Sequence, residues 1–432
     1  TSGFGYKYFS APFQAAKVSE FADDIDLDAA FPSFYWYEEN QPSTGWGAYT
    51  DPTAPLTPMQ GYAAQMGAGT ASRTVAITGT VNNGTVTATT LSNNNQPDTK
   101  GFNLVGNPYP SPIDWDAATG WSRTNIDNAV YYFNAGTADQ YAGTYSSYIN
   151  GVSSDGIANN VIAAMQGFFV HVTNGAFPVT GTLSINNAAR INNLSPNFYR
   201  EPQTATLLRL TAAFTEDGGP PDAAVIYFDD AATSAFEKDM DALKLMNTDP
   251  RVPNLYTIAA DSPQLSICAW PKPDSNDVIS LGLKIERTGW ITFNAASMER
   301  IPQGLRIYLQ DNKTGLVQDL QERPQYRVQL TAGSYEGRFS IIFKKNGSGP
   351  PEAAGARDRA VSKGRMLYGY FDKVPGNKCR ITVSNLRGQV LWRQELVGSG
   401  QHELGSQYSS GLYIVSFYNS DGQVSKKVFI GN

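Results

Sequence analysis

Residues 58–66 read PMQGYAAQM, and residues 164–172 read AMQGFFVHV. Each stretch is a short apolar or aromatic run beside a glycine, which is typical of a β-strand and its turn. Three further pairs repeat in the same order: GFGYKYFSAP and GFNLVGNPYP from residues 3 and 101, FYWYEEN and VYYFNAG from 34 and 130, and VAITGTVNNG and FPVTGTLSIN from 75 and 177. Because chance would not keep this order, residues 1–199 are predicted to be two diverged copies of one β unit, about 1–97 and 98–199, that share a sandwich core.

The rest of the 432-residue chain also consists of short apolar runs between Gly, Pro, Asn and Asp, and helical periodicity is nearly absent. We therefore predict an all-β protein of tandem β-sandwich domains. Residues 200–346 are expected to form a second sandwich, residues 347–359 a linker, and residues 360–432 a small C-terminal sandwich. The strands expected in the second sandwich cover residues 206–214, 224–228, 265–269, 278–286, 289–294, 305–311, 326–330 and 338–344.

The net charge of −6 is unevenly spread, with −8 in residues 1–199 and +5 in residues 347–432. An acidic front part argues against nucleic-acid binding. No apolar run approaches the ~18 residues of a membrane-spanning helix. Cys268 and Cys379 fall in different predicted domains, so we expect no disulfide between them. The chain starts at Thr1 without a signal peptide, so either a leader has been removed or the sequence is a piece of a longer product.

Motifs for catalysis are scarce in this sequence. His171 and His402 are the two histidines of the chain, and no nucleophile motif accompanies them. His171 alternates with apolar residues and is expected to be structural. Histidine spacing for zinc, a P-loop and a dinucleotide fingerprint are missing. We therefore expect no enzyme activity and no resident cofactor.

Two groups of carboxylates invite a functional reading. Asp114 and Asp116 lie beside aromatic residues, as a glycosidase pair could, but without a second opposed acid their expected role is to cap turns. Asp24, Asp26 and Asp28 fall on one side of an extended segment and could bind calcium, although the EF-hand pattern fails. The alternative for this second group is a solvated acidic turn.

Aromatic residues offer a further possible function, the stacking of sugar rings on flat side chains. The candidates are Tyr141, Tyr145 and Tyr148, which we expect in one Gly/Ser-rich loop, together with Trp115 and Trp121. Packing inside sandwich cores is the alternative role for these rings.

The last 22 residues, GLYIVSFYNSDGQVSKKVFIGN, alternate in apolar character on both sides of an Asp-Gly turn, which predicts a β-hairpin. Gly411-Leu412-Tyr413, Asp421-Gly422 and Lys426-Lys427-Val428, with the preceding ITVSNLRGQVLW, resemble the C-terminal sorting domain of type IX secretion substrates. The Pro-Asn-Pro segment that opens such domains is missing. The resemblance implies a small Ig-like sorting domain, read by the secretion translocon, and export across the outer membrane of a Gram-negative bacterium.

Residues 204–344 resemble a module that precedes such tails in large surface proteins, and GFNLVGNPYPSPIDWD resembles a stretch recurrent in them. The resemblance implies a non-enzymatic, secreted cell-surface protein: an adhesin, or a structural or stalk subunit whose partners are a glycan or neighbouring surface subunits. The alternative is a carbohydrate-binding or accessory region of a larger secreted hydrolase with its catalytic domain upstream.

Overall fold

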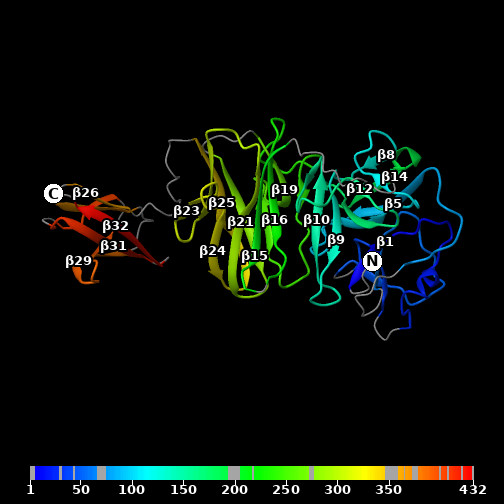
Figure 1. Ribbon diagram of the computed structural model, residues 1–432, viewed down its shortest axis with the longest axis horizontal. Helices are drawn as coiled ribbons and strands as arrows, with labels where there is room; N and C mark the ends of the chain where they lie inside the picture. The colour runs from blue at the N-terminus through cyan, green and yellow to red at the C-terminus, as the bar shows by residue number, and fades with distance from the viewer. Residues whose placement is uncertain are drawn as a thin grey trace.

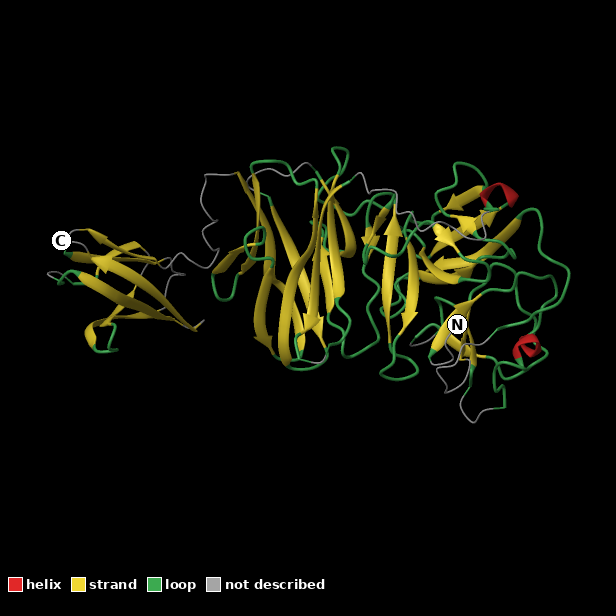
Figure 2. Cartoon of the chain, in the orientation of Figure 1, coloured by secondary structure: helices red, strands yellow, loops and turns green. Residues whose placement is uncertain are grey.

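The protein is described by a computed structural model, which covers residues 5–28, 32–41, 44–65, 74–192, 205–216, 218–271, 277–345, 359–363, 365–371, 378–397, 400–405, 408–419 and 422–430. The described residues are nearly all β (Figure 2), with two short 3-10 helices, η1 (Val18–Phe21) and η2 (Asn187–Ala189). The molecule is elongated, with the N-terminal sheets at one end and the C-terminal sheets at the other (Figure 1). The prediction of an all-β protein built from tandem sandwiches is confirmed.

Two small antiparallel sheets form the beginning of the chain. The first sheet has the strand order β1-β4-β2-β3, with β1 (Tyr6–Phe9), β2 (Phe34–Tyr37), β3 (Trp46–Ala48) and β4 (Tyr62–Gln65). The second has the order β11-β10-β9-β13-β6, with β6 (Phe102–Gly106), β9 (Val130–Ala135), β10 (Gly143–Ile149), β11 (Val152–Ser153) and β13 (Gly167–His171).

The strand order shows that these two sheets are copies of one another. The chain runs through β1, β2, β3 and β4 in one sheet and through β6, β9, β10 and β13 in the other, with the same neighbours paired in each. The register makes Gly5 equivalent to Gly101, so the sequence echo that starts at residues 3 and 101 is shifted by two residues. Both glycines have a φ near +77° (76° and 77°), a conformation that favours glycine. The pairing Tyr37 with Trp46 in one sheet corresponds to Phe133 with Tyr145 in the other. The internal repeat therefore corresponds to a repeated sheet.

The Met-Gln-Gly triplets are the points where the two copies cross. Gln60 forms a β-bridge with Val105 of the second copy, and Gln166 forms the equivalent bridge with Phe9 of the first. Met59 and Met165 both have positive φ, 67° and 60°. The Gly106 N–H donates to the Met59 carbonyl (3.1 Å), just as the Ser10 N–H donates to the Met165 carbonyl (2.9 Å). Each copy therefore closes onto the strand of the other.

A third sheet covers the outer face of the second copy. Its order is β5-β14-β8, with β5 (Val86–Asn93), β8 (Trp121–Thr124) and β14 (Val179–Ile185), and β7 (Ile113–Asp114) pairs with β12 (Val161–Ile162) beside it. Leu183 and Ile185 pack there on Phe168 and Val170, all completely buried. The fourth sequence echo is not repeated as structure, because residues 179–185 form β14 whereas residues 75–84 contain no strand.

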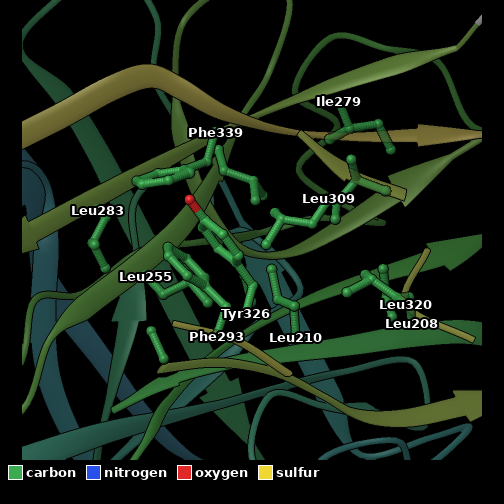
Figure 3. Close-up of a cluster of buried hydrophobic side chains, with 14 of the residues drawn as sticks. Leu208, Leu210, Leu255, Ile279, Leu283, Phe293, Leu309, Leu320, Tyr326 and Phe339 are labelled. Carbon is green, nitrogen blue, oxygen red and sulfur yellow. The ribbon is translucent and has the colours of Figure 1, made fainter. Parts of the chain in front are cut away.

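The middle of the chain is one eleven-stranded sheet that curls into a sandwich. Its path is β23-β22-β25-β20-β18-β19-β16-β15-β21-β24, with β17 added to β19. The bounds are β15 (Thr206–Phe214), β16 (Asp222–Phe228), β17 (Ala242–Leu243), β18 (Asn254–Ile258), β19 (Gln264–Trp270), β20 (Val278–Ile285), β21 (Gly289–Glu299), β22 (Leu305–Asp311), β23 (Leu316–Asp319), β24 (Gln325–Leu330) and β25 (Gly333–Lys345). Figure 3 shows that side chains from opposite ends of this path, such as Leu210 and Leu309, face one another in a single core.

The C-terminal unit has a separate core. It consists of the sheets β26-β27-β30 and β29-β28-β31-β32, with β26 (Arg359–Lys363), β27 (Met366–Phe371), β28 (Lys378–Asn385), β29 (Val390–Val397), β30 (Gly400–Glu403), β31 (Gly411–Asn419) and β32 (Gly422–Ile430). Val415 and Phe417 are completely buried in that core, as the alternation of the hairpin predicts. The linker expected at residues 347–359 lies outside the described residues except for Arg359.

The N-terminal sheets and the middle sandwich share a hydrophobic core. Phe169 and Tyr131 of the second copy belong to the same buried cluster as Val225 and Ile267 of the middle sheet. Polar contacts add to this junction: the Arg209 guanidinium donates to the carbonyls of Ser153 (3.0 Å) and Ser154 (3.1 Å). Residues 5–192 and 205–345 are therefore packed together as parts of one body.

Candidate ligand-binding cavity

An aromatic cavity of about 610 Å³ lies where the two repeated sheets meet the middle sandwich. One wall comes from the first copy, through Tyr6 and Tyr8 of β1 and Tyr37 of β2. The opposite wall comes from the second copy, through Phe133 of β9 and Tyr145 of β10. Residues 244–248 of the middle sandwich supply the third side. A volume of this size is typical of sites for small organic ligands, which often form between domains.

The period of two along a strand explains why so many rings gather here. Tyr6 and Tyr8 are two residues apart, as are Tyr35 and Tyr37, so each pair points to one face of the first sheet. Ala63 of β4 lies directly opposite Tyr8, and its small side chain leaves room between the rings. The cavity thus forms because aromatic side chains line the strands while the small side chain of Ala63 lies opposite Tyr8.

The rings hold one another in fixed orientations. Tyr37 contacts Trp46 and Phe169 edge to face, with centroids 4.9 and 5.0 Å away. Tyr8 stacks on Phe133 at 4.9 Å. Aromatic pairs with this geometry contribute about 0.5–1.5 kcal/mol each beyond the area they bury. The walls of the cavity are therefore preorganised rather than loose.

The two copies contribute equivalent positions to the cavity but different polar groups. Tyr37 and Trp46 of the first copy correspond to Phe133 and Tyr145 of the second. The Tyr145 hydroxyl hydrogen-bonds the hydroxyl of Tyr8 (3.1 Å). In the described part of the chain, neither the Tyr37 hydroxyl nor the Trp46 indole N–H has a hydrogen-bond partner. Tyr37 is only 9% exposed as a residue and lines the cavity, and its hydroxyl keeps access to water there.

Burial keeps these phenols neutral. It raises the pKa of Tyr145 to about 12, and it raises the pKa of Tyr8 and of Tyr37 still further above the usual value. Each hydroxyl can therefore both donate and accept a hydrogen bond at physiological pH.

The positive and negative charges of the side chains around the cavity cancel. Asp98 and Lys100 lie together on its rim, and both are exposed. Lys244 lines the cavity, but its ammonium is held by Asp222 with an N–O distance of 2.5 Å. The cavity therefore presents no net charge to a ligand.

The loop that carries Asp98 and Lys100 is held from below by buried groups. Glu39 is completely buried and accepts hydrogen bonds from the Asn94 N–H (3.1 Å) and from the Thr99 hydroxyl (3.2 Å). His171 contacts Asp127 through Nδ1 (2.5 Å) and donates from Nε2 to the Lys100 carbonyl (2.9 Å). His171 is 1% exposed, and its contacts are those of a structural residue, as the sequence indicates.

Only part of the predicted tyrosine set meets at this cavity. Tyr141 and Tyr145 line it, and Tyr141 stacks on Tyr6 with the ring planes 15° apart. The expectation that Tyr141, Tyr145 and Tyr148 share one loop is wrong, because Tyr145 and Tyr148 are both in β10. Three positions apart on a strand, they point to opposite faces, and the Tyr148 hydroxyl bonds Asp116 on the far side.

Trp115 and Trp121 belong to a separate, packed cluster. Trp115 is completely buried, so its ring has no face free for a sugar, and it contacts Trp121 at 4.8 Å. The Arg123 guanidinium lies over the Trp115 ring at 3.9 Å, and burial lowers the pKa of Arg123 to about 10. The predicted stacking role of Trp115 is therefore not available in this structure.

Asp114 and Asp116 serve local structure. Asp114 accepts from the Asp116 N–H (2.9 Å) and from the Asn160 side chain (2.6 Å). Burial raises the pKa of Asp116, while its bond to Tyr148 acts in the opposite direction. The two carboxylates are adjacent in one turn rather than opposed across a cleft, as a glycosidase would require.

The predicted calcium ligands do not form a metal site among the described side chains. Asp24, Asp26 and Asp28 lie in the turns after η1, and Asp26 accepts from the Asp28 N–H (3.1 Å). In the described ranges, no group of three Asp, Glu, His or Cys could hold a metal ion. The calcium hypothesis gains no support here and stays a prediction.

The predicted sorting residues lie in the terminal hairpin. Gly411, Leu412 and Tyr413 begin β31, and Gly422 begins β32, whereas Asp421 lies outside the described residues. Buried Val428 pairs with buried Tyr413; Lys427 is exposed, whereas half-buried Lys426 lies on the same face of the strand as Val428. The hairpin itself is confirmed, since Asn419 pairs with Gly422 across a two-residue connection.

The main residues that sequence reasoning missed are Tyr8, Tyr37 and Trp46. Their signal was present, because YKYF and FYWY are period-two aromatic runs inside the repeat. What the sequence did not show is that the equivalent strands of both copies face one another across one space.

The fold and the cavity define a nearly all-β protein of repeated sheets with an aromatic site at the junction of the repeats. Residues 1–343 match the family described as Domain of unknown function (DUF8693), and the chain belongs to this family. The minor fimbrium subunit Mfa5 of Porphyromonas gingivalis is 22% identical to the chain over 339 residues, which are 73% of this chain and 26% of Mfa5. The chain thus spans about a quarter of the length of that relative. No helix in the described ranges is long and apolar enough to cross a membrane.

Proposed function

We propose that this chain is part of a non-enzymatic cell-surface protein of the fimbrial type, which acts as an adhesin or as a structural subunit. The observation that carries the proposal is the similarity to a minor fimbrium subunit over 339 residues. The N-terminal sheets and the middle sandwich share a core within an elongated molecule, which suits a protein that must span distance and present a surface. The Asp114 carboxylate accepts hydrogen bonds from the Asp116 N–H and Asn160, and the Asp116 carboxylate accepts one from the Tyr148 hydroxyl, which agrees with a binding or structural role.

We further propose that the C-terminal unit directs export through the type IX secretion system. Two features support this: the terminal stretch resembles the sorting domains of that system, and the unit has its own core, separate from the rest. Exposed Lys427 and half-buried Lys426 precede the buried Val428 on the last strand and are the charged groups that it offers to a translocon.

Neighbouring surface subunits are the proposed partners after export. Sheets with open edges can accept a strand from another molecule through backbone hydrogen bonds. In the first copy β3 (Trp46–Ala48) has only β2 as its neighbour, so its outer edge is unpaired in the chain as described.

Cell fractionation and protease accessibility of whole cells test the export proposal in the native host. Deleting residues 412–432 is expected to keep the protein inside the envelope, and so is the milder Lys426→Ala/Lys427→Ala double variant, which leaves the core of the hairpin intact. The matched control is Arg387→Ala/Arg393→Ala, which removes two exposed charges elsewhere in the same unit. Normal surface display of the deletion variant would contradict the proposal.

A further inference from the structure

We propose that the aromatic cavity binds the terminal, uncharged sugar residues of a glycan. The inference goes beyond the proposed function, because it concerns what the purified chain binds and is independent of how the protein is exported. It rests on three properties of the cavity: the aromatic walls, the polar groups that have no partner within the protein, and the balance of charge.

The walls suit the apolar face of a sugar ring. Tyr141 is 47% exposed and stacks on Tyr6 with the ring centroids 5.5 Å apart, so the exposed part of the Tyr141 side chain forms a platform at the cavity. Trp46, half-buried, faces the same space from β3. Sugars present axial C–H groups to such rings while their hydroxyls remain free for hydrogen bonds.

The polar groups distinguish a sugar from a hydrocarbon chain. The Tyr37 hydroxyl and the Trp46 indole N–H line the cavity without a partner among the described residues. An acyl chain in this space would take away their water and return no hydrogen bond, which is unfavourable. Sugar hydroxyls both donate and accept, so they can satisfy Tyr37 and Trp46 at once.

The balance of charge favours an uncharged ligand. Lys244 is neutralised by Asp222, and Asp98 and Lys100 carry opposite charges on the rim. An acidic sugar would be attracted by Lys100 but repelled by Asp98. A quaternary ammonium would be attracted by Asp98 but repelled by Lys100. On an exposed rim such opposed charges largely cancel.

The middle sandwich fixes the platform in place. The Thr248 hydroxyl donates to the Tyr141 carbonyl (2.7 Å), and the Asn247 side chain accepts from the Tyr145 N–H (2.9 Å). Because these contacts order the tyrosines before any ligand arrives, binding requires little reorganisation.

Saturation-transfer difference NMR and calorimetry on the purified full chain test the proposal. The probes are the methyl glycosides of glucose, mannose, galactose, fucose and N-acetylglucosamine at millimolar concentration, followed by a printed array of larger glycans. The counter-probes are decanoate and N-acetyltyrosinamide, which represent an acyl chain and an aromatic peptide side chain. At least one neutral glycoside or glycan is expected to bind, and the counter-probes are not.

Two variants connect the binding to the cavity. Tyr37→Phe removes only the unpaired hydroxyl and is expected to weaken binding about five- to tenfold, while Trp46→Ala removes a wall and is expected to weaken it more than tenfold. The matched controls are Tyr335→Phe and Trp290→Ala, which lie in the middle sandwich and are expected to leave affinity unchanged. Tyr37→Phe keeps the ring, so loss of binding there does not reflect unfolding.

Three results would overturn the proposal. One is the absence of binding by every neutral glycoside and glycan. The second is sugar binding that is equal in the wild type, Tyr37→Phe and Trp46→Ala, since the site would then lie elsewhere. The third is binding of decanoate or N-acetyltyrosinamide in place of sugars, which would assign the cavity to an acyl chain or to a peptide.

Discussion

Asp311 is a completely buried carboxylate at the end of β22, and its partners determine its charge. The Arg338 guanidinium donates twice to it, at 3.1 and 2.9 Å, and the Tyr326 hydroxyl donates at 3.0 Å. Burial alone would raise the pKa of Asp311, but the bonds and the charge of Arg338 outweigh it, and the pKa is lowered. The carboxylate is thus ionised in the folded protein at neutral pH.

We predict that Asp311→Asn lowers the free energy of unfolding by about 3–5 kcal/mol at pH 7, because Arg338 is left buried with its partner uncharged.

The lowered pKa of Asp311 also predicts how stability depends on pH. A group whose pKa is lowered on folding stabilises the fold at pH values above its pKa in the unfolded chain, and this contribution is lost as the pH falls through its pKa in the folded protein. Wild-type stability should therefore decline as the pH drops below about 4. Urea denaturation as a function of pH measures both effects.

The control for this measurement is Asp319→Asn, a partly exposed carboxylate whose ion pair with Arg306 is nearer the surface. Its effect is expected to stay within about 1 kcal/mol. If Asp311→Asn and Asp319→Asn lowered the free energy of unfolding equally, the buried Asp311–Arg338 pair would contribute no more to stability than the pair near the surface.

Gly61 and Gly167 let the two copies approach one another. A Cβ on Gly61 would lie 2.5 Å from Leu104 Cγ and 2.7 Å from the Val105 carbonyl oxygen, and one on Gly167 would lie 2.8 Å from Tyr8 Cβ. We predict that Gly61→Ala and Gly167→Ala each destabilise the fold by about 1–3 kcal/mol, because backbone must move to admit the methyl group. Thermal denaturation measures the effect.

Gly175→Ala serves as the matched glycine, since its Cβ would meet only the end of the Val179 side chain, at 3.2 Å. It should change the melting temperature little. If Gly61→Ala left the melting temperature unchanged while Gly175→Ala lowered it, the close approach of the two copies at the Met-Gln-Gly triplets would be contradicted.

At the level of single residues, the sequence identified some members of the cavity and misplaced others. Tyr141 and Tyr145 were correctly singled out as a candidate pair that the fold brings to one cavity. Tyr148 was grouped with them by its spacing, but residues 143–149 form a strand, and residues three apart on a strand diverge. Burial of Trp115 could not be read from the sequence, because an indole beside aspartates is as compatible with a surface as with a core.

Strands with a clear alternation were the elements best predicted from sequence. The ranges expected for residues 206–214 and 305–311 match β15 and β22 without a shift. β18 (Asn254–Ile258) was not among the expected strands, since it is short and mostly buried on both faces and so shows no alternation. The parallel pairing of β16 with β19 also escaped prediction, because pairing partners far apart in sequence leave no local signal.

Phe417 of β31 is completely buried in the core of the C-terminal unit, which contains no residue from the other cores. We predict that Phe417→Ala lowers the stability of this unit by about 3–5 kcal/mol through loss of packing and a residual cavity. The larger body should keep its own transition, so scanning calorimetry is expected to show only one of two transitions move. Exposed Phe429, in β32, provides the control, and Phe429→Ala should shift neither transition appreciably.

A shift of both transitions in Phe417→Ala would mean that the C-terminal unit is coupled to the rest. That outcome would contradict the separation of cores on which the proposed export role partly rests.

At the scale of the whole molecule, the shared core makes a clear prediction about fragments. Leu207, Val225 and Ile267 of the middle sheet are completely buried together with residues of the N-terminal sheets. Residues 205–345 produced alone would expose this face, so we expect them to self-associate and to bind a hydrophobic dye strongly. Co-expression with residues 1–204 should cover the face and yield a one-to-one complex, measured by light scattering.

A fragment of residues 205–345 that stays monomeric and binds no dye would show that the junction is a simple contact between independent domains. The sequence predicted the division of the chain into sandwiches but not this junction, because its apolar residues are distributed over strands of both parts and look like ordinary core positions in each.

The reciprocal crossing at the two Met-Gln-Gly triplets has an evolutionary consequence. Each copy supplies the closing bridge of the other, so neither could be lost after the duplication without opening its partner. Within that constraint, equivalent positions were free to diverge wherever they did not touch the crossing, as Tyr37 and Phe133 have done. The duplicated unit thus encloses a hollow between two similar walls, and the difference between Tyr37 and Phe133 makes one wall more polar than the other.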